Sequence, residues 1–209
     1  MDPAPPQFKM LGRLNPKTTC LLICDVQERF RDLILNFGSV ASAAGFLVGV
    51  SRVLGMRALA TEQYPERLGA TVAEVGLGGE AGAGIPVLPK KKFSMLTPEV
   101  EAKLEEMQAE EGQEQLESFV IVGLETHVCV QQTCLDLLAQ GYNVHLAVDG
   151  ISSMRAFDRS TALDRMRTAG AFTSTAESLV FELLGSADHP QFKQCSGLVK
   201  ARTGHWPAV

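Results

Sequence analysis

The sequence has no long run of basic residues, and its only cluster of positive charge is Lys90-Lys91-Lys92. The net charge is −5, and charged residues make up 21% of the chain. Because proteins that bind nucleic acids carry basic surfaces that neutralise phosphates, we expect no nucleic acid among the partners. Hydrophobic residues at 45% describe an ordinary globular protein, and 209 residues are enough for one domain with a sizeable core.

The five cysteines are an odd number and include no Cys-x-x-Cys pair. Disulfide frameworks are typical of small secreted chains, and this chain is too long to need one. We therefore expect reduced thiols in an intracellular, cytoplasmic protein, and import into an organelle stays open. Without that spacing the sequence also offers no obvious zinc site, so we expect no metal.

The amino terminus lacks the apolar core of a secretory signal. We expect residues 1–10 to be a mobile leader, residues 11–200 to form the folded domain, and residues 201–209 to be a carboxyl-terminal tail. The uncharged stretch from Leu33 to Ser51 contains many alanine, serine and glycine residues, which make it less apolar than a membrane-spanning helix. We predict a helix packed against a sheet and no association with a membrane.

Short apolar runs alternate with helical patterns along the chain. Strands are predicted over residues 19–25, 56–63, 85–90, 118–124, 142–149 and 171–174. Helices are predicted over residues 27–54, 98–111, 126–140, 156–169, 176–184 and 190–200. This alternation predicts one α/β domain, a three-layer α/β/α structure with a six-stranded, mainly parallel sheet of the Rossmann-like kind.

The stretch GLGGEAGAG, residues 76–84, loosely matches the glycine pattern of dinucleotide-binding proteins. In those proteins a helix that binds phosphate follows the glycines, whereas here Ile85-Pro86 follows them. We interpret the stretch as a flexible surface loop.

Three reactive side chains are predicted at the carboxyl edge of the sheet, where such folds place their chemistry. Asp25 follows the first strand, Lys90 ends the third, and Cys129 comes just after the fourth. Singly they have ordinary explanations: a helix cap, a solvated charge and a small buried side chain. Together they could form a reactive site. A helix N-terminus and a nearby lysine both lower the pKa of a thiol, and a carboxylate can accept the thiol proton.

The backbone at the predicted helix start adds a further element of such a site. Its N–H groups would face an oxyanion formed when a thiol attacks a carbonyl carbon. His127 is a rival partner for Cys129, but residues two apart do not share a helix face, so we expect no direct Cys–His pair. Cys134 lies on another face of the helix, which favours packing over a redox pair with Cys129. Cys20 and Cys24 share one face of the first strand, where burial is expected.

At these residues the chain resembles the isochorismatase-like cysteine hydrolases. Three stretches look like the signature segments of that family, in the family's order: LLICDVQERF, PKKKFSM and GLETHVCVQQT. TEQYPERLGATVAEVG and DHPQFK further resemble the eukaryotic isochorismatase domain-containing proteins. The resemblance extends over roughly residues 11–200, and implies a six-stranded parallel sheet between helices and assembly into dimers or tetramers.

The resemblance also implies a catalytic triad of Asp25, Lys90 and Cys129. The family's lysine stands three residues before an aromatic residue that is followed by a small one, so Phe93-Ser94 selects Lys90 among the three lysines. Family members commonly have a cis peptide bond at the equivalent of Leu124-Glu125. Here such a bond would aim backbone amides at the oxyanion. By analogy of position, the substrate pocket is expected to contain Phe30, Glu62, Gln63, Tyr64 and Phe93.

The chain departs from one branch of the family after the second predicted strand. Nicotinamidases bind a metal there through an Asp-x-His motif and a further histidine, whereas this chain has TEQYPERLG and no histidine. A metal-dependent nicotinamidase is therefore disfavoured. The resemblance instead implies hydrolysis of a small carboxamide or related C–N bond by Cys129, without a cofactor. Two alternatives stay open: a vinyl-ether hydrolase of the isochorismatase kind, for which Asp25 matters more than Cys129, and an inactive binding scaffold.

Overall fold

The computed structural model describes residues 11–110 and 112–202. Its centre is a six-stranded sheet in the order β3-β2-β1-β4-β5-β6, with every neighbouring pair of strands parallel. The strands are β1 (Thr19–Cys24), β2 (Arg57–Gln63), β3 (Val87–Lys90), β4 (Ser118–Leu124), β5 (Asn143–Ser152) and β6 (Phe172–Ser174). The predicted six-stranded parallel sheet is confirmed.

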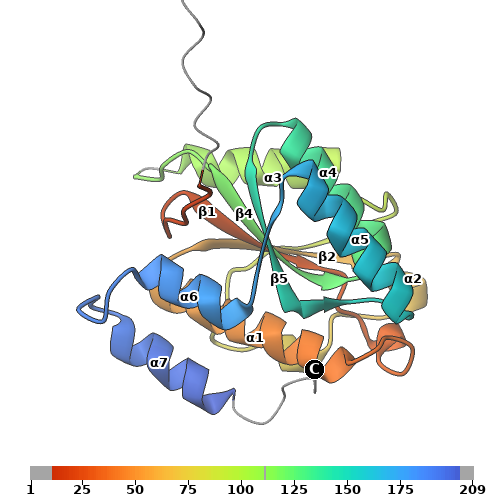
Figure 1. Ribbon diagram of the computed structural model, residues 1–209, viewed down its shortest axis with the longest axis horizontal. Coiled ribbons are helices and arrows are strands. Elements are labelled where there is room, and N and C mark those ends of the chain that lie inside the picture. Colours follow the sequence, from red (N-terminus) through yellow and green to blue (C-terminus); the bar gives the residue numbers. More distant parts are fainter. Residues whose placement is uncertain (1–10, 111, 203–209) are drawn as a thin grey trace, which may run out of the picture.

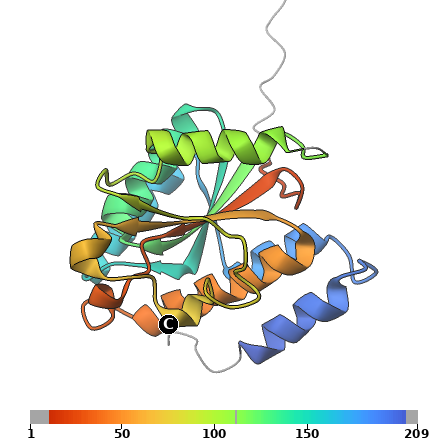
Figure 2. The same ribbon diagram turned by 180° about the vertical axis from the view of Figure 1, so that it is seen from behind.

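Helices cover both faces of this sheet. The α-helices of the described chain are α1 (Phe37–Leu54), α2 (Pro65–Leu68), α3 (Pro98–Ala109), α4 (Gln131–Ala139), α5 (Ala156–Ala169), α6 (Ala176–Leu184) and α7 (Phe192–Ala201). Three further helical turns are η1 (Glu28–Phe30), η2 (Ala73–Val75) and η3 (Thr126–Val130). Figures 1 and 2 show α1, α6 and α7 on one face and α3, α4 and α5 on the other, which confirms the three-layer α/β/α architecture.

A hydrophobic layer lies on each face of the sheet. Strands β1 and β4 are buried along their whole length, as expected for central strands of a parallel sheet. Because side chains alternate along a strand, Leu21 and Ile23 of β1 pack on the α1 side, whereas Leu22 packs on the α4 side. The two layers hold the carboxyl ends of β1 and β4 in fixed positions, and the candidate site is built at those ends.

Helix α1 fills the core of one layer. It is the one helix in the described part of the chain that is long and apolar enough to cross a membrane. Most of its residues are buried inside the protein, and it packs against β5, α6 and α7. At Gly45 an added Cβ would lie 2.4 Å from the carbonyl oxygen of Glu74, so only glycine lets η2 approach this closely. The predicted packing of this helix against the sheet is confirmed.

The prediction of one helix over residues 27–54 was wrong at its amino-terminal end. The structure has only the short turn η1 before α1 begins at Phe37. Asn36 adopts a left-handed conformation with φ of 55°, which an α-helix cannot accommodate. The Leu35 N–H donates to the carbonyl oxygen of Ser153 at 3.1 Å. The segment before α1 therefore bonds to the end of β5, which extends three residues beyond the predicted strand.

The glycine-rich stretch and the end of the last helix can be compared with the predictions. Residues 76–84 form turns between η2 and β3. Helix α7 ends at Ala201, and the Arg202 guanidinium lies 2.8 Å from the Asp149 carboxylate. Ala201 and Arg202, the first two residues of the predicted tail, therefore belong to the folded domain. The predicted leader, residues 1–10, and the rest of the predicted tail lie outside the described residues.

Candidate active site

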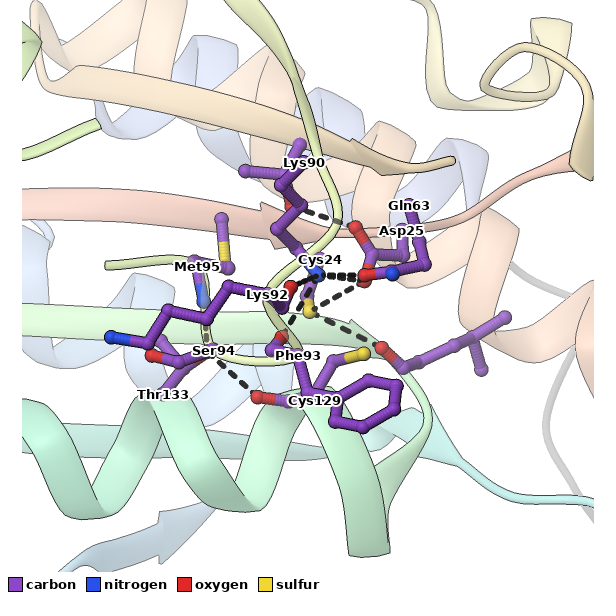
Figure 3. A network of polar contacts seen from close by, with 12 residues as sticks. Cys24, Asp25, Gln63, Lys90, Lys92, Phe93, Ser94, Met95, Cys129 and Thr133 are labelled. Carbon is purple, nitrogen blue, oxygen red and sulfur yellow. Dashed lines mark hydrogen bonds and ion pairs between the residues drawn. The ribbon is translucent and has the colours of Figure 1, made fainter. Parts of the chain in front are cut away.

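The carboxyl ends of β1 and β3 bring a carboxylate and an ammonium group together across the end of β2. Lys90 Nζ lies 2.7 Å from Asp25 Oδ2, and both side chains are fully buried. The other carboxylate oxygen, Oδ1, accepts a hydrogen bond from Thr61 Oγ1 of β2 at 2.8 Å. Figure 3 shows this pair at the centre of a network of polar contacts. Sequence reasoning did not identify Thr61, because its role depends on the register that pairs it with Cys24.

The Lys90 ammonium group is surrounded by oxygen atoms. Besides Asp25, it donates to Gln63 Oε1 at 2.7 Å and to the carbonyl oxygens of Lys92 and Phe93 at 3.2 and 2.8 Å. Burial works to lower the pKa of Lys90, but the nearby Cys24, Asp25 and Cys129 outweigh it, and the net effect is a raised pKa. Lys90 therefore stays cationic at neutral pH.

Asp25 and Tyr64 both adopt left-handed backbone conformations, with φ of 52° and 40°. Such conformations are rare for residues other than glycine and often occur at functional sites. Each residue directly follows a strand, Asp25 after β1 and Tyr64 after β2. The Asp25 N–H donates to the carbonyl oxygen of Thr61, and the Tyr64 N–H to that of Lys90. The carboxyl edge is thus cross-linked by main-chain hydrogen bonds.

Cys129 lies in η3, a single π-helical turn that leads into α4. The predicted helix over residues 126–140 is therefore present, but its first turn is wider than an α-helical turn. Thr133 Oγ1 donates to the Cys129 carbonyl oxygen at 2.7 Å and accepts from the Met95 N–H at 2.8 Å. These bonds tie the turn that carries the thiol to the segment that follows Lys90, as Figure 3 shows. The Cys129 side chain is buried but retains 6% exposure.

Cys24 is a second thiol of this site, and sequence reasoning assigned it only to the core. Its burial is confirmed, because Cys24 has no exposed surface. Its Sγ lies 3.2 Å from the Leu124 carbonyl oxygen and 3.6 Å from Asp25 Oδ2. Burial, followed by the contact with Cys129 and the charge of Asp25, raises the pKa of Cys24 well above its ordinary value. No sequence pattern distinguishes this thiol from Cys20, which lies four residues earlier on the same face of β1.

The peptide bond between Leu124 and Glu125 is cis, as the family resemblance implied. The Glu125 carbonyl oxygen accepts from the N–H groups of Val128 and Val130 at 3.1 and 3.2 Å. Its carboxylate accepts from the Met154 N–H at 2.9 Å. These contacts fix the connection from β4 to η3, and the role of its amides toward an oxyanion stays a prediction.

The five expected pocket residues lie in different surroundings. Tyr64 and Lys90 border a cavity of about 440 Å³ between α2 and the start of α3, whereas Asp25 and Cys129 do not line it. Gln63 contacts Lys90 directly, and Glu62 accepts from the N–H and hydroxyl groups of Thr71 at 2.6 and 2.8 Å. The remaining two are aromatic: Phe93 is 52% exposed, and Phe30 packs half-buried against the core on the α1 side.

His127 and Cys134, the other neighbours of Cys129 in the sequence, make no hydrogen bond to Asp25 or Lys90. His127 Nδ1 lies 3.0 Å from Ser153 Oγ, and its Nε2 is 4.0 Å from Asp158 of α5. Cys134 is fully buried, and burial raises its pKa to about 12. Its predicted burial in the core is confirmed. Within the described residues no group of three His, Cys, Asp or Glu side chains lies close enough to hold a metal ion.

The parallel sheet, with helices on both faces and polar side chains at its carboxyl edge, places the protein in the class of three-layer α/β/α proteins. A model of the isochorismatase domain matches residues 19–178. The chain therefore belongs to the isochorismatase family of hydrolases, as the sequence resemblance indicated.

The chain is similar to several known proteins. It is 45% identical to isochorismatase domain-containing protein 1 of Salmo salar over 192 residues, which are 92% of this chain but 64% of the salmon protein. It is 43% identical over 192 residues to the secreted isochorismatase effector Isc1 of Phytophthora sojae, covering 92% of this chain and 89% of that protein. The structure of MAR1 ribonuclease from Caenorhabditis elegans has a TM-score of 0.83 and 36% identity, covering 94% of this chain and 98% of the other.

Proposed function

We propose that this chain hydrolyses a small carboxamide or a related C–N bond, with Cys129 as nucleophile and Asp25 and Lys90 as its partners. The observation that carries the proposal is the buried ion pair between Lys90 and Asp25, 2.7 Å apart, within electrostatic range of the Cys129 thiol. A buried pair of this kind is costly to maintain for stability alone, because both ions lose their hydration. Beside a thiol it supplies a proton acceptor and a positive charge that stabilises the thiolate.

The proposed reaction has two stages. Asp25 accepts the proton of Cys129, the thiolate attacks the carbonyl carbon, and the oxyanion is bound by the backbone amides of Glu125 and Cys129. The protonated Asp25 then donates its proton to the leaving amine, which leaves an acyl group on the Cys129 sulfur. Water attacks this thioester, releases the carboxylic acid and returns a proton to the sulfur. Lys90 keeps the Asp25 carboxylate in place throughout.

For the partners we propose a small-molecule substrate, no nucleic acid and no membrane, in a cytoplasmic dimer or tetramer. RNA is the polymer to test, because the C. elegans relative is described as a ribonuclease. Two observations argue against RNA for this chain. Its net charge is −5, and in the lysine cluster Lys90 is bound to Asp25 while Lys92 lies 3.5 Å from Asp136. With so little unpaired positive charge in this cluster, we expect it to bind phosphates weakly.

The test is a screen of small carboxamides, a vinyl ether and an RNA oligonucleotide, with wild type, Cys129→Ala and the control Cys134→Ala. We expect amide turnover to fall on the order of 10³-fold or more in Cys129→Ala, because the nucleophile is gone. Cys134→Ala removes a thiol from a comparably buried position, and this variant is expected to keep its turnover. Both variants are expected to stay folded by circular dichroism and thermal melting.

Other results would reject the amide hydrolase. Vinyl-ether hydrolysis that survives Cys129→Ala but is abolished by Asp25→Asn would establish the vinyl-ether alternative. RNA cleavage by wild type would overturn the proposal about partners. No turnover of any substrate, together with a Cys129 thiol no more reactive than a free cysteine, would favour the inactive scaffold.

A further inference from the structure

Cys24 occupies a position between the members of the triad. It is the last residue of β1, directly before Asp25, and it pairs in register with Gly123 of β4. Its side chain lies on the α4 side of the sheet, in the same buried cluster as Cys129. Figure 3 shows hydrogen bonds from its sulfur to the Asp25 carboxylate and to a main-chain carbonyl oxygen, which belongs to Leu124. The Cys129 thiol is a neighbour in this cluster and contributes to the raised pKa of Cys24.

The Cys24 thiol can donate a hydrogen bond, but its surroundings disfavour its ionisation. It is fully buried, and burial is the largest cause of its raised pKa, followed by the contact with Cys129 and the charge of Asp25. The charge of Lys90 opposes these effects and is outweighed. A thiol that stays protonated has one S–H donor. Leu124 O and Asp25 Oδ2 lie within hydrogen-bond distance of this thiol, and a third acceptor, Cys129 Sγ, lies in the same buried cluster.

We propose that Cys24 is a positioning residue of the triad, whose S–H donates a hydrogen bond to the Cys129 thiolate once Asp25 has taken the proton. This inference rests on the proposed function, since it assigns a partner to the nucleophile of that reaction. When Cys129 ionises, its sulfur becomes the strongest of the three acceptors, because bonds to charged acceptors are stronger than bonds to neutral ones. Rotation about the Cβ–Sγ bond turns the S–H from the Leu124 carbonyl toward the thiolate. The bond adds to the stabilisation that Lys90 provides.

The test measures the alkylation rate of Cys129 by iodoacetamide from pH 5 to 10, with each cysteine-containing peptide quantified by mass spectrometry. Cys24→Ala and Cys24→Val remove the donor with opposite changes in volume, whereas Cys24→Ser retains an O–H donor. Cys20→Ala is the matched control. Cys20 lies four residues earlier on the same face of β1 and is equally buried, but its sulfur contacts the Leu21 carbonyl oxygen at 3.8 Å instead of the triad.

We expect the Ala and Val variants at position 24 to raise the apparent pKa of Cys129 and to slow its alkylation at pH 7 by about tenfold. Cys24→Ser is expected to stay near the wild-type rate, and Cys20→Ala to leave it unchanged. Equal rates in wild type and in both donor-free variants would overturn the inference. So would equal slowing in Cys20→Ala, which would assign the effect to packing.

The same data separate this inference from the proposed function. A wild-type Cys129 that alkylates no faster than a free cysteine, with its ordinary pKa of about 8.5, would reject the proposed function and this inference with it. A fast wild-type Cys129 that is indifferent to Cys24 would reject the inference alone. Thermal melting of each variant shows that the rates refer to folded protein, and Cys24→Val remains available if the cavity left by Ala prevents folding.

Discussion

Among single residues, Lys90 and Asp25 carry the strongest electrostatic interaction of the site. Each is buried at the end of a different strand, and the two strands are separated by β2. Removing one partner from such a pair leaves the other charge buried and unpaired, which costs about 3–5 kcal/mol. Neutralising both avoids that penalty, so the two substitutions are expected to be strongly non-additive.

This coupling can be measured with Lys90→Met, Asp25→Asn and the double variant. We expect each single variant to lower the free energy of unfolding by about 3 kcal/mol, and the double variant to lose clearly less than the sum of the two. Urea unfolding at pH 7 gives all four values. Additive losses would show that the two groups do not interact in solution. All three variants are expected to be inactive if the proposed function holds. Unfolding therefore measures the coupling between the two charges, and activity tests the proposed function independently.

Single residues also show what sequence alone can identify at the site. Asp25, Lys90 and Cys129 each follow or end an apolar strand, so the pattern of strands and the resemblance to a family selected them. Thr61 and Cys24 lie inside strands and look like ordinary core residues. The contacts of Thr61 with Asp25 and of Cys24 with Leu124 depend on which strand pairs with which, and in what register. That information lies in pairings between residues 37 positions or more apart.

At the scale of elements, the connection from β4 to η3 depends on a glycine. Gly123 has φ of 126°, and a Cβ at this position would lie 2.0 Å from the Cys24 carbonyl oxygen, an atom of the neighbouring strand's backbone. The backbone conformation and the lack of space both require glycine. Cys24 ends β1 and Leu124 ends β4, so this close approach of the two strands brings Cys24 next to the connection that leads to Cys129.

Gly123→Ala tests that dependence, with Gly141→Ala as its control. Gly141 also has a positive φ, 89°, but an added Cβ there would meet nothing within 4 Å. We expect Gly141→Ala to cost about 1 kcal/mol, from backbone conformation alone. Gly123→Ala is expected to cost clearly more, about 3 kcal/mol or above, because β1 and β4 must also separate. Equal losses in urea unfolding would show that the backbone there yields easily.

The elements also mark the limit of prediction from periodicity. Helices α5 and α6 were predicted to the residue, because their apolar spacing and flanking residues are local signals. The segment before α1 was predicted as helix because its residues fit a helical pattern. Its actual conformation is set by hydrogen bonds to Ser152 and Ser153, more than a hundred residues away in the sequence. No local pattern contains that contact.

At the scale of the whole molecule, the buried thiols make the free energy of unfolding depend on pH in the alkaline range. Burial raises the pKa of both Cys20 and Cys134 from 9.0 to about 12. Below pH 9 both thiols are protonated whether the chain is folded or unfolded, and their contribution to stability is fully present. Between pH 9 and 12 the unfolded chain releases these protons and the folded chain does not, so stability falls as pH rises.

The expected slope is about 1.4 kcal/mol per pH unit for each such thiol. Cys134→Ala is therefore expected to make the decline of unfolding free energy between pH 9 and 11 shallower by about that amount. Urea unfolding at several pH values measures it, and slopes are compared because the substitution also lowers stability at every pH. Identical slopes in wild type and variant would mean that Cys134 ionises as readily in the folded chain as in the unfolded one.

The position of β3 has a consequence for how the proposed activity would be lost under stress. This four-residue strand is at the edge of the sheet and pairs only with β2 within the described chain, yet it supplies Lys90. Edge segments open locally at a lower free energy than central strands. Fraying of β3 would withdraw the only buried cation of the triad while both hydrophobic layers stay intact. Mild denaturant should therefore silence the site before it melts the fold, so that hydrogen exchange at β3 tracks the loss of activity and exchange at β1 and β4 lags behind.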